Sequence, residues 1–388
     1  MSIVPSTGAA ERILLTGATG FLGAQIVREL LSRFPEASLV LLARGSGDQT
    51  AEQRLSALVR RCGEAEDGAN ARPRIEVLPA DITQERCGLS REQWEAAARG
   101  ATRIIHCASS VRFDMDLRDA RQVNVGGARN LLELAGEAHR RGDLRSFAYV
   151  STAFVAGRRE GLIREDELEK GQRFRNHYER SKCEAEALVQ SRAADLPVVV
   201  LRPAIIVGDS RTGVTTSFNA LYQLFRLYAR LRLRIIPARP ESVVDIVPVD
   251  FVAAACAWLA CEPRALGRTF HLCAGPGRAA TIREIVEAAA RFFHAPSPRF
   301  VPPGPVLAVL RPLLLATVWG RGRRFVKRGR IYRPYLDARL EFDTTQADSL
   351  LAPAGIAPPR VMDYLERIFQ FCVETDWGRR LPGQISTS

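Results

Sequence analysis

The sequence predicts an α/β fold, a doubly wound parallel sheet with a smaller, partly interleaved lobe toward the C-terminus. Over the first 210 residues, short apolar runs alternate with helical stretches, and repeated strand–helix units build a sheet covered by helices on both faces. Uninterrupted β-branched runs such as Val198–Val200 are typical of strands buried on both faces, which occur in parallel sheets. A glycine-rich turn after the first run favours the same fold class.

The elements of this first part follow from the alternation. Six apolar runs are expected as strands: Arg12–Thr16, Leu39–Ala43, Ile75–Pro79, Arg103–Cys107, Phe147–Ser151 and Val198–Arg202. Helices are expected between them, among them Phe21–Arg33, Arg118–Arg140 and Tyr178–Ala194.

After Gly208 the pattern changes. We expect a basic aromatic helix, a hairpin-like stretch, a helix, a strand and two further helices, in the order Phe218–Leu231, Pro237–Pro240, Phe251–Cys261, Phe270–Cys273, Thr281–Phe292 and Val361–Val373. Thr281 and Glu284 form a capping box, since each side chain can satisfy a free backbone amide. We therefore expect one domain over residues 1–210, to which residues 243–293 partly return, and a lobe made of residues 211–242 and 294–388.

Composition and charge exclude several classes of protein. The 388 residues are 46% hydrophobic and 25% charged, as in globular proteins and unlike disordered, collagen-like or disulfide-scaffold chains. The formal net charge is +12, and two segments without acidic residues, 219–240 and 321–333, hold five and seven basic residues and so account for all of it. A nucleic-acid binder spreads its charge less selectively, and no recognised binding motif is present, so no nucleic-acid partner is expected.

The cysteines and the apolar runs indicate the cellular compartment of the protein. The eight cysteines form no CxxC pair and no Cys/His cluster, so we expect neither a metal site nor a disulfide framework, and buried thiols in a reducing cytosol. The N-terminus lacks an export signal. The longest apolar run, 305–319, is broken by Arg311 and Pro312 and falls short of the roughly 18–20 residues that span a bilayer. We predict a cytoplasmic protein and leave peripheral membrane association open.

The glycine-rich turn predicts a nucleotide site. The first strand runs directly into the spacing GxxGxxG of Gly17, Gly20 and Gly23, which opens a helix. A pyrophosphate can sit on a helix N-terminus only where no side chain blocks the backbone, so this strand–turn–helix context predicts a Rossmann-like dinucleotide site. The alternative is a tight structural turn.

The end of the second strand bears on the choice of cofactor. Arg44 stands where an NAD site usually places an acid for the ribose 2′-hydroxyl, and a guanidinium suits a 2′-phosphate, which favours NADP(H). The alternative for Arg44 is a solvated surface charge. Asp81 and Ile82, just past the third strand, are expected to meet the adenine edge.

Tyr178 and Lys182 form the most specific pattern in the chain. At positions i and i+4 of a helix they share a face, and an ammonium near a phenol lowers the pKa of the phenol, which suits a proton relay. The fifth strand ends in Ser151-Thr152, so a hydroxyl can meet this phenol at the C-terminal edge of the sheet. The alternative is a pair of ordinary helix-surface side chains.

Seven segments carry a resemblance to a known family: TGATGFLG, IIHCASSVRFD, NVGGARNLLELA, YVSTAFVAG, YERSK, LRPAIIVG and DIVPVD. They follow in the order seen in extended short-chain dehydrogenases/reductases. HCASSVRFD and VSTAFVAG resemble more narrowly the fatty acyl-CoA reductase and thioester-reductase branch, because sugar-nucleotide epimerases differ there. The resemblance covers about residues 11–275 and is faint beyond Phe300.

The resemblance implies roles for individual residues. Tyr178 becomes the acid, Lys182 its pKa-lowering partner and ribose ligand, and Thr152, favoured over Ser151, the hydroxyl partner. Asn124 continues the proton relay or only braces the sheet. The cofactor-binding residues expected are Gly17, Thr19, Gly20, Phe21, Leu22, Gly23, Arg44, Asp81, Ile82, Cys107, Ala108, Lys182, Pro203 and Ala204.

The function implied is NADPH-dependent reduction of an acyl thioester to an aldehyde, with reduction on to the alcohol left open. This chain has Ser109-Ser110 where the family often has alanine-threonine, which bears on the polarity of the pocket. It carries no fused adenylation or carrier domain, so the thioester is expected on free CoA or a separate carrier protein. The alternatives are a reductase or dehydrogenase acting on a free ketone, aldehyde or hydroxysteroid, and a non-catalytic NADP(H) sensor.

The basic segments suggest partners for the C-terminal, substrate-binding lobe. CoA and phosphopantetheine carriers are anionic, and 321–333 lies in the part expected to admit substrate. The apolar run before it gives residues 305–333 the composition of an interfacial membrane segment as well. A solvated basic surface is the third interpretation, and the sequence does not predict an oligomeric state.

Overall fold

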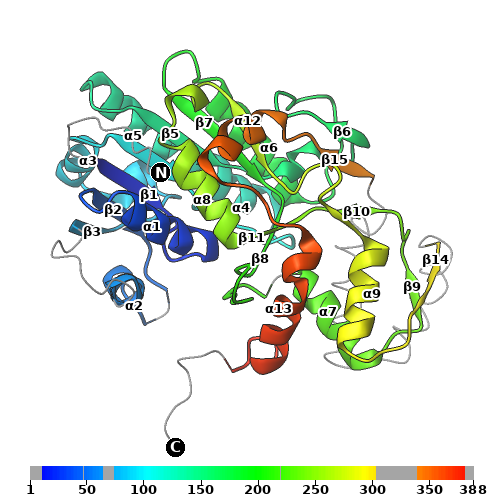
Figure 1. The fold of residues 1–388 in the computed structure, drawn as a ribbon. Helices are drawn as coiled ribbons and strands as arrows, with labels where there is room; N and C mark the ends of the chain where they lie inside the picture. Colours follow the sequence, from blue (N-terminus) through cyan, green and yellow to red (C-terminus); the bar gives the residue numbers. More distant parts are fainter. Residues whose placement is uncertain (1–10, 47, 64–73, 219, 303–338, 381–388) are drawn as a thin grey trace, which may run out of the picture.

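A seven-stranded parallel sheet forms the centre of the molecule (Figure 1). The computed structural model describes residues 11–46, 48–63, 74–218, 220–302 and 339–380. The strand order is β12-β7-β5-β4-β1-β2-β3, and every neighbouring pair is parallel. The strands are β1 Arg12–Thr16, β2 Ser38–Ala43, β3 Arg74–Pro79, β4 Arg103–His106, β5 Ser146–Val150, β7 Val198–Pro203 and β12 Thr269–Leu272. The predicted fold class is confirmed, and the ends of the six predicted strands differ by at most one residue.

Helices cover both faces of this sheet. Along β1, Ile13 and Leu15 pack into one apolar cluster and Leu14 into the other, so the strand is buried on both sides. Helices α1, α2 and α8 contribute to the first cluster and α3, α5 and α6 to the second. Their bounds are α1 Phe21–Arg33, α2 Ala51–Gly63, α3 Arg91–Ala98, α4 Leu117–Arg121, α5 Gly127–Arg140, α6 His177–Gln190 and α8 Val249–Leu259.

The strand order sets the place of the site. From β1 the chain builds outward through β2 and β3, and then returns to β4 on the other side of β1. In open α/β sheets, ligands bind in the crevice at the carboxyl ends of the strands where the order reverses. The turn after β1 and the ends of β4 and β5 therefore face this crevice.

Three helices form a third apolar cluster below the sheet in the view of Figure 1: α7 Ala220–Leu231, α9 Ile282–Phe292 and α13 Val361–Glu374. Tyr222, Ile285 and Ile368 meet in it. Three short parallel pairs accompany these regions: β6 Gly161–Ile163 with β15 Leu340–Phe342, β8 Ile205–Val207 with β11 Ile246–Pro248, and β9 Ile235–Pro237 with β14 Arg299–Val301. The β8–β11 pair joins the two regions, because Val247 packs into the cluster of the sheet and Ile246 into that of the three helices. The short antiparallel pair is β10 Val243–Val244 with β13 Ala280–Thr281.

The hairpin predicted through Pro237–Pro240 is wrong. The strands on its two sides do not pair with each other: β9 pairs with β14 and β10 with β13, both from later in the chain. The remaining elements are α12 Thr345–Leu351 and the short 3₁₀ turns η1 Glu85–Gly88, η3 Ala153–Ala156, η4 Pro263–Ala265 and η6 Ala352–Ala354.

The predicted division into a domain and a lobe stays a prediction. The packing shows which elements lie together. Helix α8 and strand β12 return to the sheet as expected, whereas α9 packs with α7 and α13. Helix α12 and β15 pack into the cluster of the sheet instead. Both differences arise because the chain passes to the other region after β12, is back at the sheet in β15 and α12, and leaves it again for α13.

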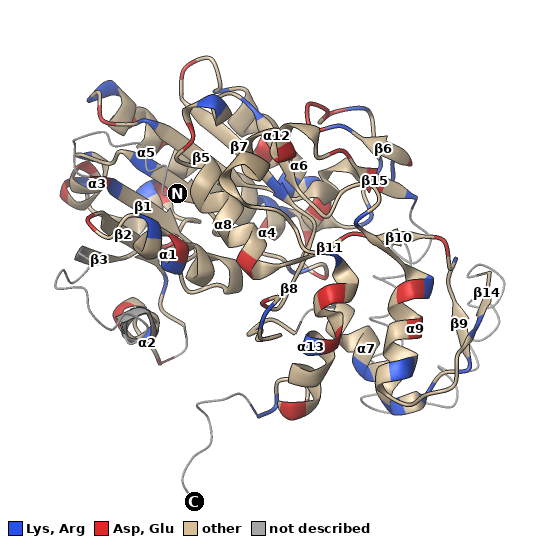
Figure 2. Ribbon diagram, in the orientation of Figure 1, with Lys and Arg blue, Asp and Glu red and all other residues tan. Residues whose placement is uncertain are grey.

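The structure places the first of the two basic segments on the fold. The basic residues of 220–240 lie on α7 and in the loops before and after β9 (Figure 2). Segments 305–319 and 321–333 lie outside the described residues. No helix within the described ranges is long and apolar enough to cross a membrane. Nor do the side chains of these ranges form a His, Cys, Asp or Glu group suited to a metal ion.

Candidate active site

The turn between β1 and α1 needs glycine at two positions for steric reasons. Gly17 has φ +81°, and a Cβ there would lie 2.8 Å from the backbone nitrogen of Ala108, at the end of β4. A Cβ at Gly23 would lie 2.1 Å from the carbonyl oxygen of Gly17. Gly20 is the N-cap of α1, and no side chain caps its amides. The turn therefore leaves a bare helix N-terminus at the crevice, which suits a pyrophosphate.

Arg44 and Asp81 lie at the ends of β2 and β3, close to this turn in the sheet. The Arg44 guanidinium is 3.6 Å from the Asp81 carboxylate, and the Arg44 side chain is 70% exposed. Thr83 donates two hydrogen bonds to Asp81. Although partial burial raises the pKa of Asp81, these bonds and the charge of Arg44 hold it below its ordinary value. The sequence predicted both residues at the nucleotide but not their ion pair.

Tyr178 and Thr152 are brought together by α6 and the end of β5. Asn176 caps α6 by accepting a hydrogen bond from the Glu179 amide, which places Tyr178 in the first turn of the helix. Burial raises the pKa of Tyr178 to about 12, although a hydrogen bond with the Thr152 side chain works in the opposite direction. The Thr152 hydroxyl is also 3.4 Å from the carbonyl oxygen of Pro203, at the end of β7. Two hydroxyls therefore meet at the carboxyl edge of the sheet.

Lys182 lies one helical turn further along α6 and is 1% exposed. Its ammonium donates to the hydroxyl of Tyr149 at 2.8 Å and to the carbonyl of Val150 at 2.7 Å. Burial lowers the pKa of Lys182 to about 7. The expected lowering of the Tyr178 pKa by this ammonium is not seen, because Lys182 bonds to Tyr149 and burial of the Tyr178 phenol dominates.

Ser151, the second candidate hydroxyl, points to a different partner. It donates to the Glu186 carboxylate at 2.5 Å, and Glu186 forms an ion pair with Arg202 that is fully buried on both sides. The hydroxyl of Ser151 is thus committed to a structural network, while that of its neighbour Thr152 faces Tyr178.

Comparison with known proteins assigns the family. Residues 15–256 match the NAD-binding domain family described as male sterility protein. The chain belongs to this family. This family is a branch of the extended short-chain dehydrogenases/reductases, so the resemblance that the sequence showed is confirmed.

The relatives of this chain fall into two groups, fatty acyl-CoA reductases and nonribosomal peptide synthetases. Human fatty acyl-CoA reductase 1 is 30% identical over 295 residues, 66% of this chain and 56% of that protein. The nonribosomal peptide synthetase asaC of Aspergillus flavus is 30% identical over 278 residues, 69% of this chain and 26% of that protein. The terminal R domain of the myxalamid biosynthetic pathway has a TM-score of 0.80 and 27% identity, covering 96% of this chain and 93% of the domain. The chain thus spans little more than half the length of the fatty acyl-CoA reductases it matches.

Several buried residues of this family member were not predicted. His106, at the end of β4, bonds Thr16 through Nδ1 at 2.7 Å, and its Nε2 has no hydrogen-bond partner among the described residues. Tyr149 accepts a hydrogen bond from Lys182, and Glu186 accepts one from Ser151. Glu186 follows Lys182 by four residues, so the helical spacing alone places it on the same face, a signal that could have identified it.

Asn124 joins two walls of the site in this family member. It lies in the π-helical turn Gln122–Gly126, which interrupts the helix predicted over Arg118–Arg140. Its side chain accepts from the Ser110 amide at 3.0 Å and donates to the Ser181 hydroxyl at 2.9 Å. Single π turns are frequent at functional sites. Here the turn braces the loop after β4 against α6.

The residues present fit an NAD(P) cofactor. The bare N-terminus of α1 forms a cradle for a pyrophosphate. The turn that leads into it can fold this tightly because Gly17 and Gly23 have no Cβ, which would lie against the backbone of Ala108 and of Gly17. Cys107 and Ala108 lie directly beside this cradle, and burial raises the pKa of Cys107 to about 12, so its thiol is protonated. Pro203 and Ala204 are buried at the end of β7, which lies next to β5 in the sheet. Of the other predicted contacts, Thr19 lies in the turn after β1, Phe21 and Leu22 begin α1, and Ile82 follows β3.

Proposed function

We propose that this chain reduces an acyl thioester, carried on CoA or on a carrier protein, with NADPH. The observation that carries the proposal is the pair of hydroxyls of Tyr178 and Thr152 at the carboxyl edge of the sheet, beside a glycine cradle at the switch point. The relatives add support, because they are named as fatty acyl-CoA reductases or as reductase domains of peptide synthetases.

The two hydroxyls account for the chemistry. NADPH, when bound, supplies a hydride to the thioester carbonyl carbon. Tyr178 and Thr152 donate hydrogen bonds to the carbonyl oxygen as it gains negative charge, the kind of preorganised stabilisation that usually contributes most to catalysis. Collapse of this intermediate breaks the carbon–sulfur bond, releases the thiolate and leaves an aldehyde. A second round on the aldehyde, with Tyr178 as the proton donor, gives the alcohol.

We assign the catalytic hydroxyl to Thr152 and the cofactor-positioning ammonium to Lys182. The commitment of Ser151 to Glu186 supports the first assignment. The position of Lys182 beneath the end of β5, next to the carbonyl of Val150, supports the second. Asn124 holds the loop and helix that carry these groups.

We assign NADP(H) as the cofactor on the basis of Arg44. Its exposed guanidinium at the end of β2 suits a 2′-phosphate, and Asp81 orients it from β3. The expected result for Arg44→Ala is a KM for NADPH raised by about ten-fold with the KM for NADH unchanged, because one charge-assisted contact is lost.

The test is NADPH consumption against a panel of acyl-CoAs of graded length, with the products identified by mass spectrometry. Tyr178→Phe is expected to reduce turnover by about two to four orders of magnitude, the usual contribution of a general acid. Turnover of a free ketone, aldehyde or hydroxysteroid and of no thioester would overturn the proposal. So would NADPH oxidation that Tyr178→Phe leaves unchanged.

A further inference from the structure

Two segments without acidic residues lie side by side at one end of the molecule, away from the central sheet (Figure 1). Residues 228–238 run from the last turn of α7 through β9, and residues 288–302 run from the end of α9 through β14. Strands β9 and β14 pair in parallel, and the Arg299 amide donates to the carbonyl of Arg234 at 2.8 Å. The Tyr228 hydroxyl also donates to the carbonyl of Pro296, at 3.3 Å. We call this small surface the basic end.

The positive charge of the basic end exceeds the negative charge beside it. Arg230 lies 4.0 Å from the Asp376 carboxylate, which also pairs with Arg379 at 3.2 Å. Burial and the charges of Arg230 and Arg379 lower the pKa of Arg226 on α7. Figure 2 shows basic and no acidic residues where α7 and α9 lead into β9 and β14. The exposed arginines of the basic end that form no ion pair with a described residue are Arg232, Arg234, Arg291 and Arg299.

Two aliphatic side chains stand among these arginines. Leu231 is 60% exposed and Ile235 is 53% exposed, whereas Leu233 between them packs against the cluster of α7, α9 and α13. Each exposed aliphatic residue directly follows an arginine, so apolar and positive side chains alternate at the surface. Exposed aliphatic side chains next to basic ones are typical of a surface that lies in a membrane interface.

The aromatic residues favour a membrane over a protein as the partner. Within residues 228–238 and 288–302, Tyr228 is buried, and Phe292, Phe293 and Phe300 are half-buried. These two segments therefore offer no fully exposed aromatic side chain, the kind of residue that usually anchors a protein–protein interface. Arginine and short aliphatic side chains are what the basic end presents.

We propose that the basic end binds the surface of an anionic membrane. The arginines contact lipid phosphates, to which a guanidinium can donate two parallel hydrogen bonds, and Leu231 and Ile235 insert among the headgroups. The inference does not depend on the proposed function, because membrane binding is measured without turnover. It concerns a different part of the chain from residues 305–333, which lie outside the described residues.

Co-sedimentation of the full chain with lipid vesicles tests the role of charge. One set of vesicles consists of phosphatidylcholine, and the other of equal parts of phosphatidylcholine and phosphatidylglycerol. We expect binding to the anionic set and not to the neutral one. Arg232→Ala/Arg234→Ala is expected to weaken this binding by about thirty-fold, the combined contribution of two basic residues near an anionic surface. Equal binding to both sets, or unchanged binding of this variant, would overturn the proposal.

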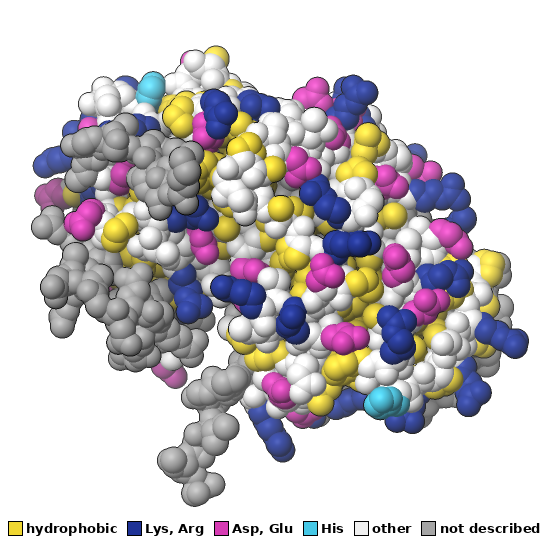
Figure 3. All heavy atoms as spheres, viewed as in Figure 1, with side chains coloured by type: hydrophobic (Ala, Val, Ile, Leu, Met, Phe, Trp, Pro, Cys, Tyr) yellow, Lys and Arg dark blue, Asp and Glu magenta, His cyan; other side chains and the backbone are white. Residues whose placement is uncertain are grey.

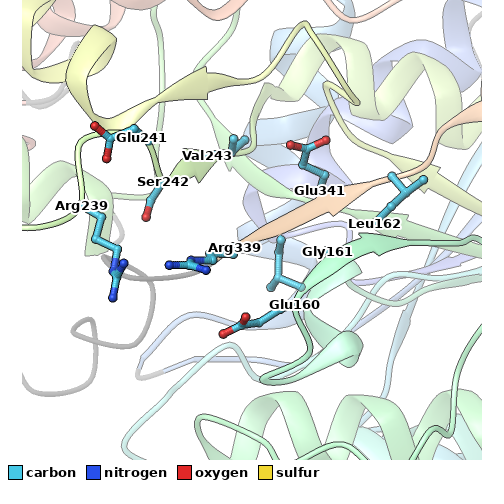
Figure 4. A pocket seen from close by; sticks show the side chains of 10 residues that line it. Glu160, Gly161, Leu162, Arg239, Glu241, Ser242, Val243, Arg339 and Glu341 are labelled. Atoms are coloured by element: carbon cyan, nitrogen blue, oxygen red, sulfur yellow. The ribbon is translucent and has the colours of Figure 1, made fainter.

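A matched control removes two positive charges from elsewhere on the molecule, in Arg28→Ala/Arg339→Ala. Arg28 is exposed on α1, and Arg339 helps to line a pocket of about 640 Å³ together with Glu160, Glu241 and Glu341 (Figure 4). We expect this variant to bind anionic vesicles nearly as the wild type does, because salt screens charges that do not face the bilayer. An equal loss of binding in both double variants would show that net charge acts instead of the basic end.

Leu231→Ser/Ile235→Ser leaves the charge unchanged and tests insertion. We expect it to weaken binding to anionic vesicles by about ten-fold, because two aliphatic side chains no longer leave water. In Leu231→Trp, the emission of the added tryptophan, taken as the difference from the wild type, is expected to shift to the blue with anionic vesicles. Leu266→Trp, at a position 38% exposed and outside the basic end, is the control without a shift. Unchanged binding of the serine variant, or no shift in Leu231→Trp, would refute insertion and so the proposal.

An acidic protein is the competing partner, and poly-L-glutamate serves as its probe. Binding to poly-L-glutamate that is lost in Arg232→Ala/Arg234→Ala, together with no binding to anionic vesicles, would overturn the proposal in favour of an acidic protein surface. Binding to anionic vesicles that both the arginine and the serine variants weaken supports the membrane, whether or not the chain turns over a thioester.

Discussion

The neighbouring hydroxyls of Ser151 and Thr152 at the end of β5 have different roles, and substituting each residue distinguishes the two roles. Ser151→Ala leaves the buried Glu186 carboxylate without one of its donors, so we expect the free energy of unfolding to fall by about 1–3 kcal/mol with kcat nearly unchanged. Thr152→Ala is expected to lower kcat by about a hundred-fold or more, as for the loss of one donor to a developing oxyanion. Urea unfolding and steady-state kinetics measure both. A larger loss of kcat in Ser151→Ala than in Thr152→Ala would reverse our assignment.

Lys182 makes stability depend on pH. Its pKa in the folded protein is lowered from 10.5 to about 7 by burial, so between these values the unfolded chain binds more protons than the folded one. The free energy of unfolding must therefore rise with pH across this window, and the full cost of burying the ammonium is present below pH 7. In protein without nucleotide, we expect the wild type to gain a few kcal/mol at most from neutral to alkaline pH relative to Lys182→Met. Denaturant unfolding at graded pH measures this, and parallel profiles for the two proteins would contradict it.

At the scale of elements, the turn between β1 and α1 combines a steric requirement with a binding one. A methyl group at Gly23 would lie 2.1 Å from the Gly17 carbonyl, whereas at Gly20 the nearest atom is 3.2 Å away. Gly23→Ala is therefore expected to destabilise the fold by about 1–3 kcal/mol, the usual cost of overpacking. Gly20→Ala is expected to melt near the wild-type temperature but to bind NADPH more weakly, because its methyl group stands at the bare helix N-terminus. Thermal melting and NADPH fluorescence titration distinguish the two, and equal melting temperatures would refute the steric argument.

Helix α6 is held against the sheet by groups on one face. Tyr178, Lys182 and Glu186 repeat every four residues, and Glu186 is anchored by the buried guanidinium of Arg202 on β7. The same network continues from Arg202 to His271 of β12 at 3.2 Å. The catalytic candidates therefore share their helix face with a buried ion pair that fixes the register of α6 on the strands.

These elements show which features the sequence predicts and which it does not. Strands such as β1 were predictable because burial on both faces makes their runs continuously apolar, and the capping box of Thr281 because it is local. The pairing of β9 was not, because its partner β14 follows some sixty residues later and three-residue strands have no distinct period. The difference between Ser151 and Thr152 depends on Glu186 and Tyr178 of another element, so side-chain direction, which the sequence does not show, decided it.

At the scale of the whole molecule, the net charge of +12 arises from two segments that follow the main part of the sheet in sequence. On the face shown in Figure 3, basic and acidic side chains of the described residues are interspersed rather than gathered in one large patch. The described basic segment, over α7 and β9, leads into the turn with Arg239. The excess of positive charge along the described segment, 220–240, attracts an anionic substrate to that part of the molecule without making the whole protein bind polyanions.

This arrangement predicts a selective response to salt. The Debye length shortens from roughly 10 Å at 0.1 M salt to 3 Å at 1 M, so attraction between the basic segments and a charged substrate is largely screened at the higher concentration. We expect the KM for acyl-CoA to rise several-fold across this range while kcat stays constant. The KM for the uncharged N-acetylcysteamine thioester of the same acid should not rise, because only its apolar contacts remain. Parallel changes in both KM values would point to a general effect of salt on the fold, and a constant KM for acyl-CoA would show that the positive charge of these segments does not act on the substrate.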